Sequence, residues 1–127
     1  MSVARPIAAV LLASGIAACG GGSSTTPTPP PQTNPYTITI AAGGVVSPKD
    51  LTVPLGTRVL FMNNDSRRHD MASDDHPDHR DCPELNINPL NPGQSRESGN
   101  LVTARTCGYH DHDSPTDRNL QGSIIIR

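Results

Sequence analysis

The chain has 127 residues, of which 34% are hydrophobic and 17% are charged, and its formal net charge is −2 at pH 7. This length allows one folded domain. The chain is net acidic and carries only two Tyr, one Phe and no Trp. It therefore lacks the basic surface and stacking aromatic residues of a nucleic-acid-binding protein, and we exclude nucleic acid as a partner.

The first 18 residues have the pattern of a secretory signal peptide. A short basic start containing Arg5 precedes an apolar core at residues 6–13, and small residues at 16–18 lead directly to Cys19. The core is too short to span a membrane. The pattern is similar to the bacterial lipobox, which implies that residues 1–18 are a lipoprotein signal peptide and that Cys19 is lipidated. An ordinary signal peptide with an incidental cysteine is the alternative.

Residues 19–35 are rich in Gly, Ser, Thr and Pro. Gly and Ser make the first part of this segment flexible, and the prolines make the second part semi-extended. Such a segment cannot bury a core, so we interpret it as a tether. Together with the signal peptide it predicts an exported lipoprotein of the periplasm or cell envelope, anchored to a membrane through lipid, with a folded domain at residues 36–127.

Short apolar runs in residues 36–127 alternate with polar residues and are separated by Gly, Pro and Asn. This alternation predicts strands rather than helices. We expect strands at residues 36–40, 51–55, 57–63, 94–97, 101–107 and 122–127. Several short strands with turns between them predict an all-β domain, a small antiparallel sandwich. Residues 72–91 have little periodicity, and a loop of that length is usually functional or fixed by a further contact.

All five histidines and two of the three cysteines fall into two clusters. The first contains His69, His76, His79 and Cys82, and the second contains Cys107, His110 and His112. Each cluster follows an expected strand and opens a loop, so we expect the two clusters to meet at one end of the sandwich. Imidazole and thiolate together favour copper or zinc over hard cations.

The order of these motifs resembles that of the bacterial cupredoxins. The resemblance rests on residues 45–65, on His69, on the Pro92-Gly93 turn and on Cys107 followed by histidines. It covers nearly all of residues 36–127. It implies a Greek-key β-sandwich that binds one copper ion and transfers one electron at a time to or from a redox partner protein.

The resemblance also implies a ligand set. His69 would be the upstream ligand, Cys107 the thiolate, and either His110 or His112 the second imidazole, because the family uses both spacings. Cupredoxins commonly add a weak axial Met, but no methionine follows the second cluster. Met71, Gln121 or a backbone carbonyl is then the expected axial ligand.

His76 and His79 have two interpretations. They are either a second metal-binding arm or part of a solvated polar loop. Both remain open at this point.

Cys82 opens a second interpretation of the whole site. Two cysteines in an exported domain pair by default. A Cys82–Cys107 disulfide would stabilise the fold by roughly 3 kcal/mol and would remove the thiolate. The protein would then be a histidine-based carrier or storage module for copper or, less favourably, zinc, and its partner a copper-handling protein.

A third interpretation is a metal-free structural surface domain. The sequence contains no nucleophile–base pair and no paired carboxylates on separate strands. We therefore expect neither enzymatic activity nor a small-molecule substrate.

Overall fold

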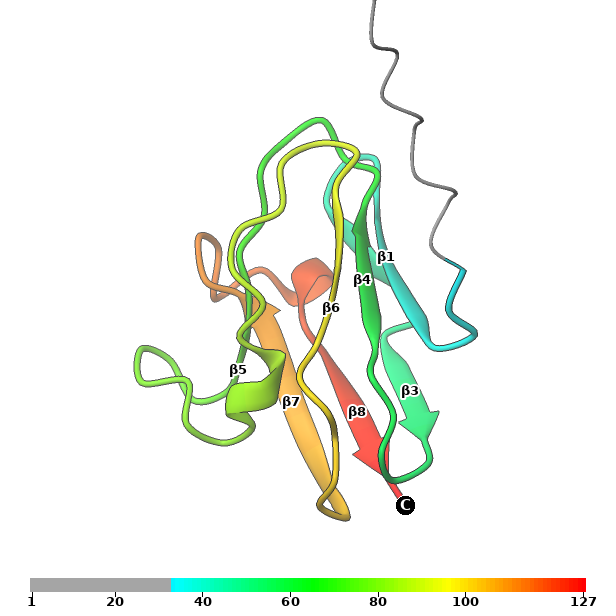
Figure 1. The fold of residues 1–127 in the computed structure, drawn as a ribbon. Coiled ribbons are helices and arrows are strands. Elements are labelled where there is room, and N and C mark those ends of the chain that lie inside the picture. The colour runs from blue at the N-terminus through cyan, green and yellow to red at the C-terminus, as the bar shows by residue number, and fades with distance from the viewer. Residues whose placement is uncertain (1–32) are drawn as a thin grey trace, which may run out of the picture. The chain divides into compact units, whose positions relative to one another are not determined.

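The computed structural model describes residues 33–127 (Figure 1). The predicted signal peptide, Cys19 and most of the predicted tether lie outside the described residues. The described part consists of eight strands and two short 3-10 helices. In this part of the chain, no helix is long and apolar enough to cross a membrane.

One sheet contains four strands in the order β2-β1-β4-β6. These strands are β1 (Thr37–Ala41), β2 (Val45–Ser47), β4 (Leu60–Asn63) and β6 (Ser95–Glu97). β1 pairs antiparallel with β2 and parallel with β4, which in turn pairs antiparallel with β6. In β1 the buried side chains are Ile38 and Ile40, as the period of two in the sequence predicts.

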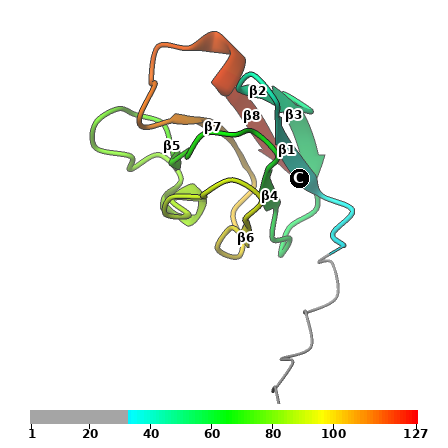
Figure 2. The same cartoon turned by 90° about the horizontal axis from the view of Figure 1, so that it is seen from above.

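The other sheet has the order β3-β8-β7-β5. Its strands are β3 (Asp50–Val53), β5 (Met71–Ser73), β7 (Arg105–Asp111) and β8 (Gly122–Ile126). β3 and β8 are parallel, whereas β8–β7 and β7–β5 are antiparallel. Figure 2 shows the two sheets from above, facing each other. The expected all-β sandwich is confirmed, but both sheets are mixed rather than purely antiparallel.

The core lies between the two sheets. Phe61 of β4 and Tyr109 of β7 meet edge to face, with ring centroids 5.6 Å apart. The Tyr109 hydroxyl donates a hydrogen bond to the Lys49 carbonyl oxygen at 3.0 Å. Burial raises the pKa of Tyr109, and the nearby Asp50 carboxylate raises it further. This contact between the sheets fixes the position of β7, the strand on which the second cluster lies.

The main difference from the expected elements concerns β7. This strand was expected at residues 101–107 but runs from Arg105 to Asp111. Its second half forms a ladder with the short edge strand β5, in which Met71 pairs with Asp111 and Ser73 with Tyr109. The sequence did not predict β5. Cys107 is therefore in the middle of a strand and His110 near its end, rather than both opening a loop.

The long segment after β5 begins with a loop and then returns to β7 through a disulfide. Residues 74–81 form a loop that projects beside β5 (Figure 1). The chain then returns at Cys82, which is disulfide-bonded to Cys107, and continues into the 3-10 helix η1 (Pro83–Leu85). The second 3-10 helix, η2 (Arg118–Leu120), lies in the connection from β7 to β8.

Candidate metal centre

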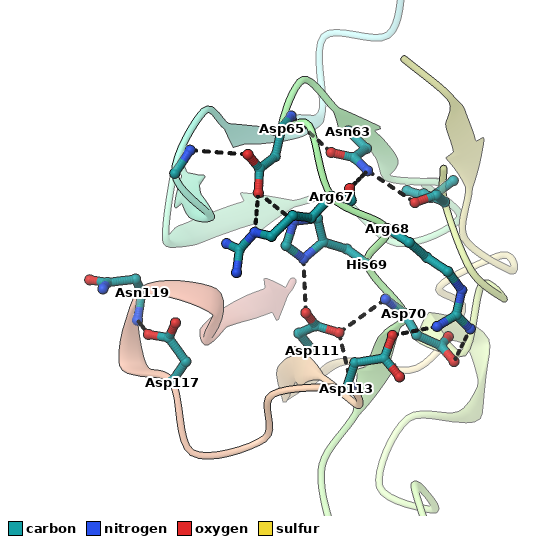
Figure 3. Close-up of polar contacts among 12 residues, drawn as sticks. Asn63, Asp65, Arg67, Arg68, His69, Asp70, Asp111, Asp113, Asp117 and Asn119 are labelled. Carbon is teal, nitrogen blue, oxygen red and sulfur yellow. Dashed lines mark hydrogen bonds and ion pairs between the residues drawn. The ribbon is translucent and has the colours of Figure 1, made fainter. Parts of the chain in front are cut away.

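His69 lies between two carboxylates in the interior of the domain (Figure 3). Its Nδ1 is 2.8 Å from Asp111 Oδ2, and its Nε2 is 2.9 Å from Asp65 Oδ2. All three side chains are buried. Each ring nitrogen of His69 is therefore within hydrogen-bond distance of a carboxylate oxygen. Both nitrogens of this predicted ligand are thus paired with protein groups in this structure.

Further hydrogen bonds keep the Asp65 carboxylate ionised. Its Oδ1 accepts from the backbone amides of Gly43 and Ser66, and its Oδ2 also accepts from Arg67 Nε at 3.0 Å. The bond from His69, followed by the amides and Arg67, holds the pKa of Asp65 well below its usual range, although burial opposes this shift.

The Asp111 carboxylate also accepts hydrogen bonds from backbone amides. Its Oδ1 accepts from the backbone amides of Asp70 and Asp113. The group formed by Asp65, His69 and Asp111, which we call the His69 network, is therefore complete without a metal.

The disulfide removes the other predicted ligand. Cys82 and Cys107 are bonded to each other, and both are fully buried in the core. The thiolate site expected from His69, Cys107 and a downstream histidine is therefore not formed in this structure. Of the two roles left open for Cys107, the structure contains the disulfide. The physical reason is the register of β7, which turns Cys107 towards the returning chain at Cys82.

A different set of histidines comes together beside β5 and β7. His76 and His79 lie in the 74–81 loop, and His110 lies in β7. Each offers one ring nitrogen, and these nitrogens all lie within 4.8 Å of one another. The ring centroids are 5.0 to 5.5 Å apart. We call these three residues the histidine cluster.

His110 is the buried member of the histidine cluster. Its Nδ1 is 2.7 Å from Asp74 Oδ1, so Nδ1 carries the proton that the carboxylate accepts. Its Nε2 is buried and has no hydrogen-bond partner within residues 33–127. An unpaired buried ring nitrogen is unfavourable unless something binds it. A metal ion would satisfy this nitrogen.

His79 is oriented by the backbone. Its Nδ1 is 2.7 Å from the carbonyl oxygen of Ser73, so Nδ1 donates and Nε2 carries the lone pair. The backbone φ angle of His79 is 51°, in the left-handed region that residues other than Gly rarely adopt. Strained backbone of this kind concentrates at functional sites.

The third member of the cluster, His76, is exposed. Partial loss of solvent around the ring lowers the pKa of His76, and the neighbouring rings of His112, His110 and His79 lower it further. A lowered pKa favours the neutral imidazole, which is the form that binds metals.

His112 stands at the edge of the cluster. Its Nδ1 is 2.7 Å from His79 Nε2, and the residue is exposed. A cavity of about 310 Å³ adjoins this pair. Its polar lining residues are Asp70, Asp78, Asn86, Asn88, His79 and His112. His112 therefore contacts the histidine cluster through His79, on the solvent side of the cluster.

Neither expected axial ligand belongs to the histidine cluster. Met71 is fully buried in the core, and Gln121 Nε2 donates a hydrogen bond to the Pro115 carbonyl oxygen at 2.8 Å. The sequence interpretation did not predict the contact of Asp74 with His110, because it depends on the pairing of β5 with β7. It also did not predict the contact of Asp65 with His69, which lies four residues further along the chain. The donors that remain are imidazole nitrogens, which suit copper and zinc.

The two facing mixed sheets, with strand orders β2-β1-β4-β6 and β3-β8-β7-β5, define a cupredoxin fold, so the resemblance found in the sequence is confirmed for the fold. The chain is similar to a purple cupredoxin from Nitrosopumilus maritimus, with a TM-score of 0.61 and 26% identity over 72% of this chain and 99% of that one. A copper-containing nitrite reductase from Thermus scotoductus matches with a TM-score of 0.60 and 24% identity, over 76% of this chain and 23% of the reductase.

A plastocyanin from the fern Dryopteris crassirhizoma matches with a TM-score of 0.56 and 16% identity, over 72% of this chain and 99% of the plastocyanin. No protein-family model and no curated protein sequence matches this chain.

Proposed function

We propose that this protein is an exported copper carrier or storage module of cupredoxin fold, in which imidazoles hold one Cu(II) ion. The observation that carries the proposal is the buried, unpartnered Nε2 of His110, placed in one cluster with ring nitrogens of His76 and His79. Three imidazoles would form the site, and His112 would be available for a fourth position.

The donor set favours copper over zinc. For a given set of nitrogen ligands, Cu(II) binds more tightly than Zn(II). Copper also appears in the names of structural neighbours, namely the copper-containing nitrite reductase and an amicyanin described in its Cu(I) form. We therefore propose copper as the resident ion and zinc as its weaker competitor.

A carrier role agrees better with this site than thiolate-based electron transfer. Blue copper electron-transfer sites depend on a Cys ligand, whereas Cys107 is bonded to Cys82. His76 and His112 are exposed, so ligands of a partner protein can approach the ion directly. The partner in this proposal is a copper-handling protein that exchanges the ion by successive ligand replacement.

Export and lipid anchoring remain part of the proposal. A disulfide is typical of proteins in an oxidising compartment, which supports the interpretation of residues 1–18 as a signal peptide. Lipidation of Cys19 would keep the carrier at a cell-envelope membrane. Mass spectrometry of the protein purified from its native membrane would test this through the mass of the acyl chains on Cys19.

Titration of the metal-free protein with Cu(II) tests the proposed site. We expect one equivalent to bind, with an electron paramagnetic resonance spectrum that shows several nitrogen ligands and without the intense visible band of a copper–thiolate bond. The double variant His76→Gln/His79→Gln should lose tight binding. The Gln121→Ala variant is the matched control, because Gln121 was an expected ligand that lies outside the cluster, and it should bind as the wild type does.

Other results would reject the proposal in distinct ways. An intense copper–thiolate band would restore the electron-transfer interpretation with Cys107 as ligand. A stable protein that binds no Cu(II) or Zn(II) would favour the metal-free structural domain.

A further inference from the structure

We infer that Asp74 is a positioning residue for the metal, and that Gly108 provides the space in which the Asp74 carboxylate lies. This inference rests on the proposed function. Asp74 would not contact the ion. Instead it would hold the His110 ring in the orientation and tautomer that present Nε2 to the other imidazoles.

The position of Asp74 follows from strand register. Ser73, the last residue of β5, pairs with Tyr109 of β7, so Asp74 comes next to Gly108. The Asp74 backbone amide donates to the Gly108 carbonyl oxygen at 3.0 Å. The backbone therefore places the first residue of the histidine-bearing loop directly on the strand that carries His110.

Gly108 is required for space rather than for backbone conformation. Its φ angle is not positive, so another residue could adopt its backbone geometry. However, a Cβ at this position would overlap the Asp74 carboxylate, because it would lie 2.8 Å from Cγ and closer still to Oδ2. Because Gly108 has no side chain, a space is left beside β7, and the Asp74 carboxylate fills it.

The carboxylate determines how His110 can act. Asp74 Oδ1 lies 2.7 Å from Nδ1 and accepts its proton, so the neutral ring carries its lone pair on Nε2. A carboxylate on the second ring nitrogen of a metal-binding histidine also makes that ligand more basic. Nε2 is the buried atom that has no partner in the described part of the chain.

The exposure of the Asp74 side chain distinguishes a role in positioning His110 from a role in folding stability. The Asp74 side chain is 54% exposed, whereas that of His110 is 4% exposed. A pair with one partner in solvent contributes little to folding stability. Loss of the Asp74 carboxylate should therefore change metal binding much more than it changes the melting temperature.

The test compares four variants of the full-length protein. Asp74→Ala removes the acceptor, Asp74→Asn keeps an amide oxygen in its place, and Gly108→Ala displaces the carboxylate. Asp81→Ala is the matched control, because it removes the same charge from the same loop, and no side-chain hydrogen bond of Asp81 is present within residues 33–127.

We expect Asp74→Ala to weaken Cu(II) and Zn(II) binding by about 10- to 100-fold, the usual effect of removing a residue that supports a metal ligand. Gly108→Ala should act in the same direction. Asp74→Asn should recover most of the affinity, and Asp81→Ala should match the wild type. Equal affinities of Asp74→Ala and Asp81→Ala would overturn the inference.

A second measurement needs no metal. Two-bond nitrogen–proton NMR correlations report the tautomer of each histidine in the metal-free protein. We expect His110 to carry its proton on Nδ1 in the wild type and to populate the Nε2–H form in Asp74→Ala. A wild-type ring protonated on Nε2 would overturn the inference. If the wild type bound no metal, the proposed function would fail, while this measurement would still test the position of the His110 ring.

Discussion

The two places where histidines gather in this domain differ in how completely their ring nitrogens are bonded. In the His69 network, each nitrogen of a buried ring is paired with a carboxylate oxygen. In the histidine cluster, His110 keeps a buried Nε2 without a partner, and two further rings lie nearby. For a ring that is fully buried, a complete set of hydrogen bonds favours a structural role, whereas a buried nitrogen without a partner is a position that an ion can fill.

The largest effect that we expect is on metal affinity, and it tests the difference between the histidine cluster and the His69 network. Replacement of His110 by Gln removes the buried nitrogen donor, so we expect Cu(II) affinity to fall by more than about 100-fold, beyond the effect of a supporting residue. The melting temperature of the metal-free protein should change little, because the ring has an unpaired nitrogen in that state. Competition with a chelator of known affinity measures the loss. Unchanged affinity in His110→Gln would mean that the cluster is not the metal site.

The opposite behaviour is expected for His69→Gln. This change leaves Asp65 and Asp111 facing each other without the ring between them, and breaking a buried ionic pair is strongly destabilising. We expect the melting temperature of the metal-free protein to fall by about 10 °C or more. Cu(II) affinity at a temperature where both proteins are folded should stay within about threefold of wild type, since the expected loss at a true ligand exceeds tenfold. A loss as large as that of His110→Gln would show that His69 is a ligand after all.

The disulfide gives the third effect in size. The double variant Cys82→Ala/Cys107→Ala frees a loop between cysteines separated by 25 residues, and we expect unfolding to become easier by about 3 kcal/mol. Cu(II) affinity should also fall, because the loop with His76 and His79 loses its second attachment to β7. Denaturant unfolding and metal titration measure the two effects. A variant with lower stability but wild-type affinity would mean that the disulfide does not pre-organise the site.

The smallest effect that we expect is a dependence of folding stability on pH, which arises from Asp65 in the His69 network. Hydrogen bonding lowers the pKa of Asp65 in the folded state relative to the unfolded state. Its contribution to stability is therefore present above the ordinary carboxyl pKa and is lost as the pH falls towards the folded-state pKa. Asn at this position cannot ionise. The difference in melting temperature between wild type and Asp65→Asn should thus be largest near neutral pH and should narrow towards about pH 3. A constant difference would contradict the role given to the Asp65 carboxylate.

The sequence predicted the fold better than the site. Alternation in residues 36–40 and 122–127 identified strands because each strand has one buried face, and the motif order was sufficient for the cupredoxin resemblance. Edge strand β5 has only three residues, all of them buried, so it has no alternation to detect.

The arrangement of the candidate metal centre depends on β5, which the sequence did not predict. Pairing of β5 with β7 decides that Cys107 meets Cys82 and that Asp74 meets His110. Local patterns do not specify which residues pair across strands. The sequence therefore indicated the histidines as a group of candidate ligands, while their division into a bonded network and an open cluster required the structure.

The attachment of the 74–81 loop has a consequence for how this protein can change. Ladder pairing of Ser73 with Tyr109 fixes one end of the loop to β7, and the Cys82–Cys107 bond fixes the other. The eight residues between these anchors are mostly exposed, outside the sandwich core. Substitutions or insertions within this loop can therefore change which side chains are available to bind a metal. The anchoring residues at both ends would keep the fold of the sandwich unchanged.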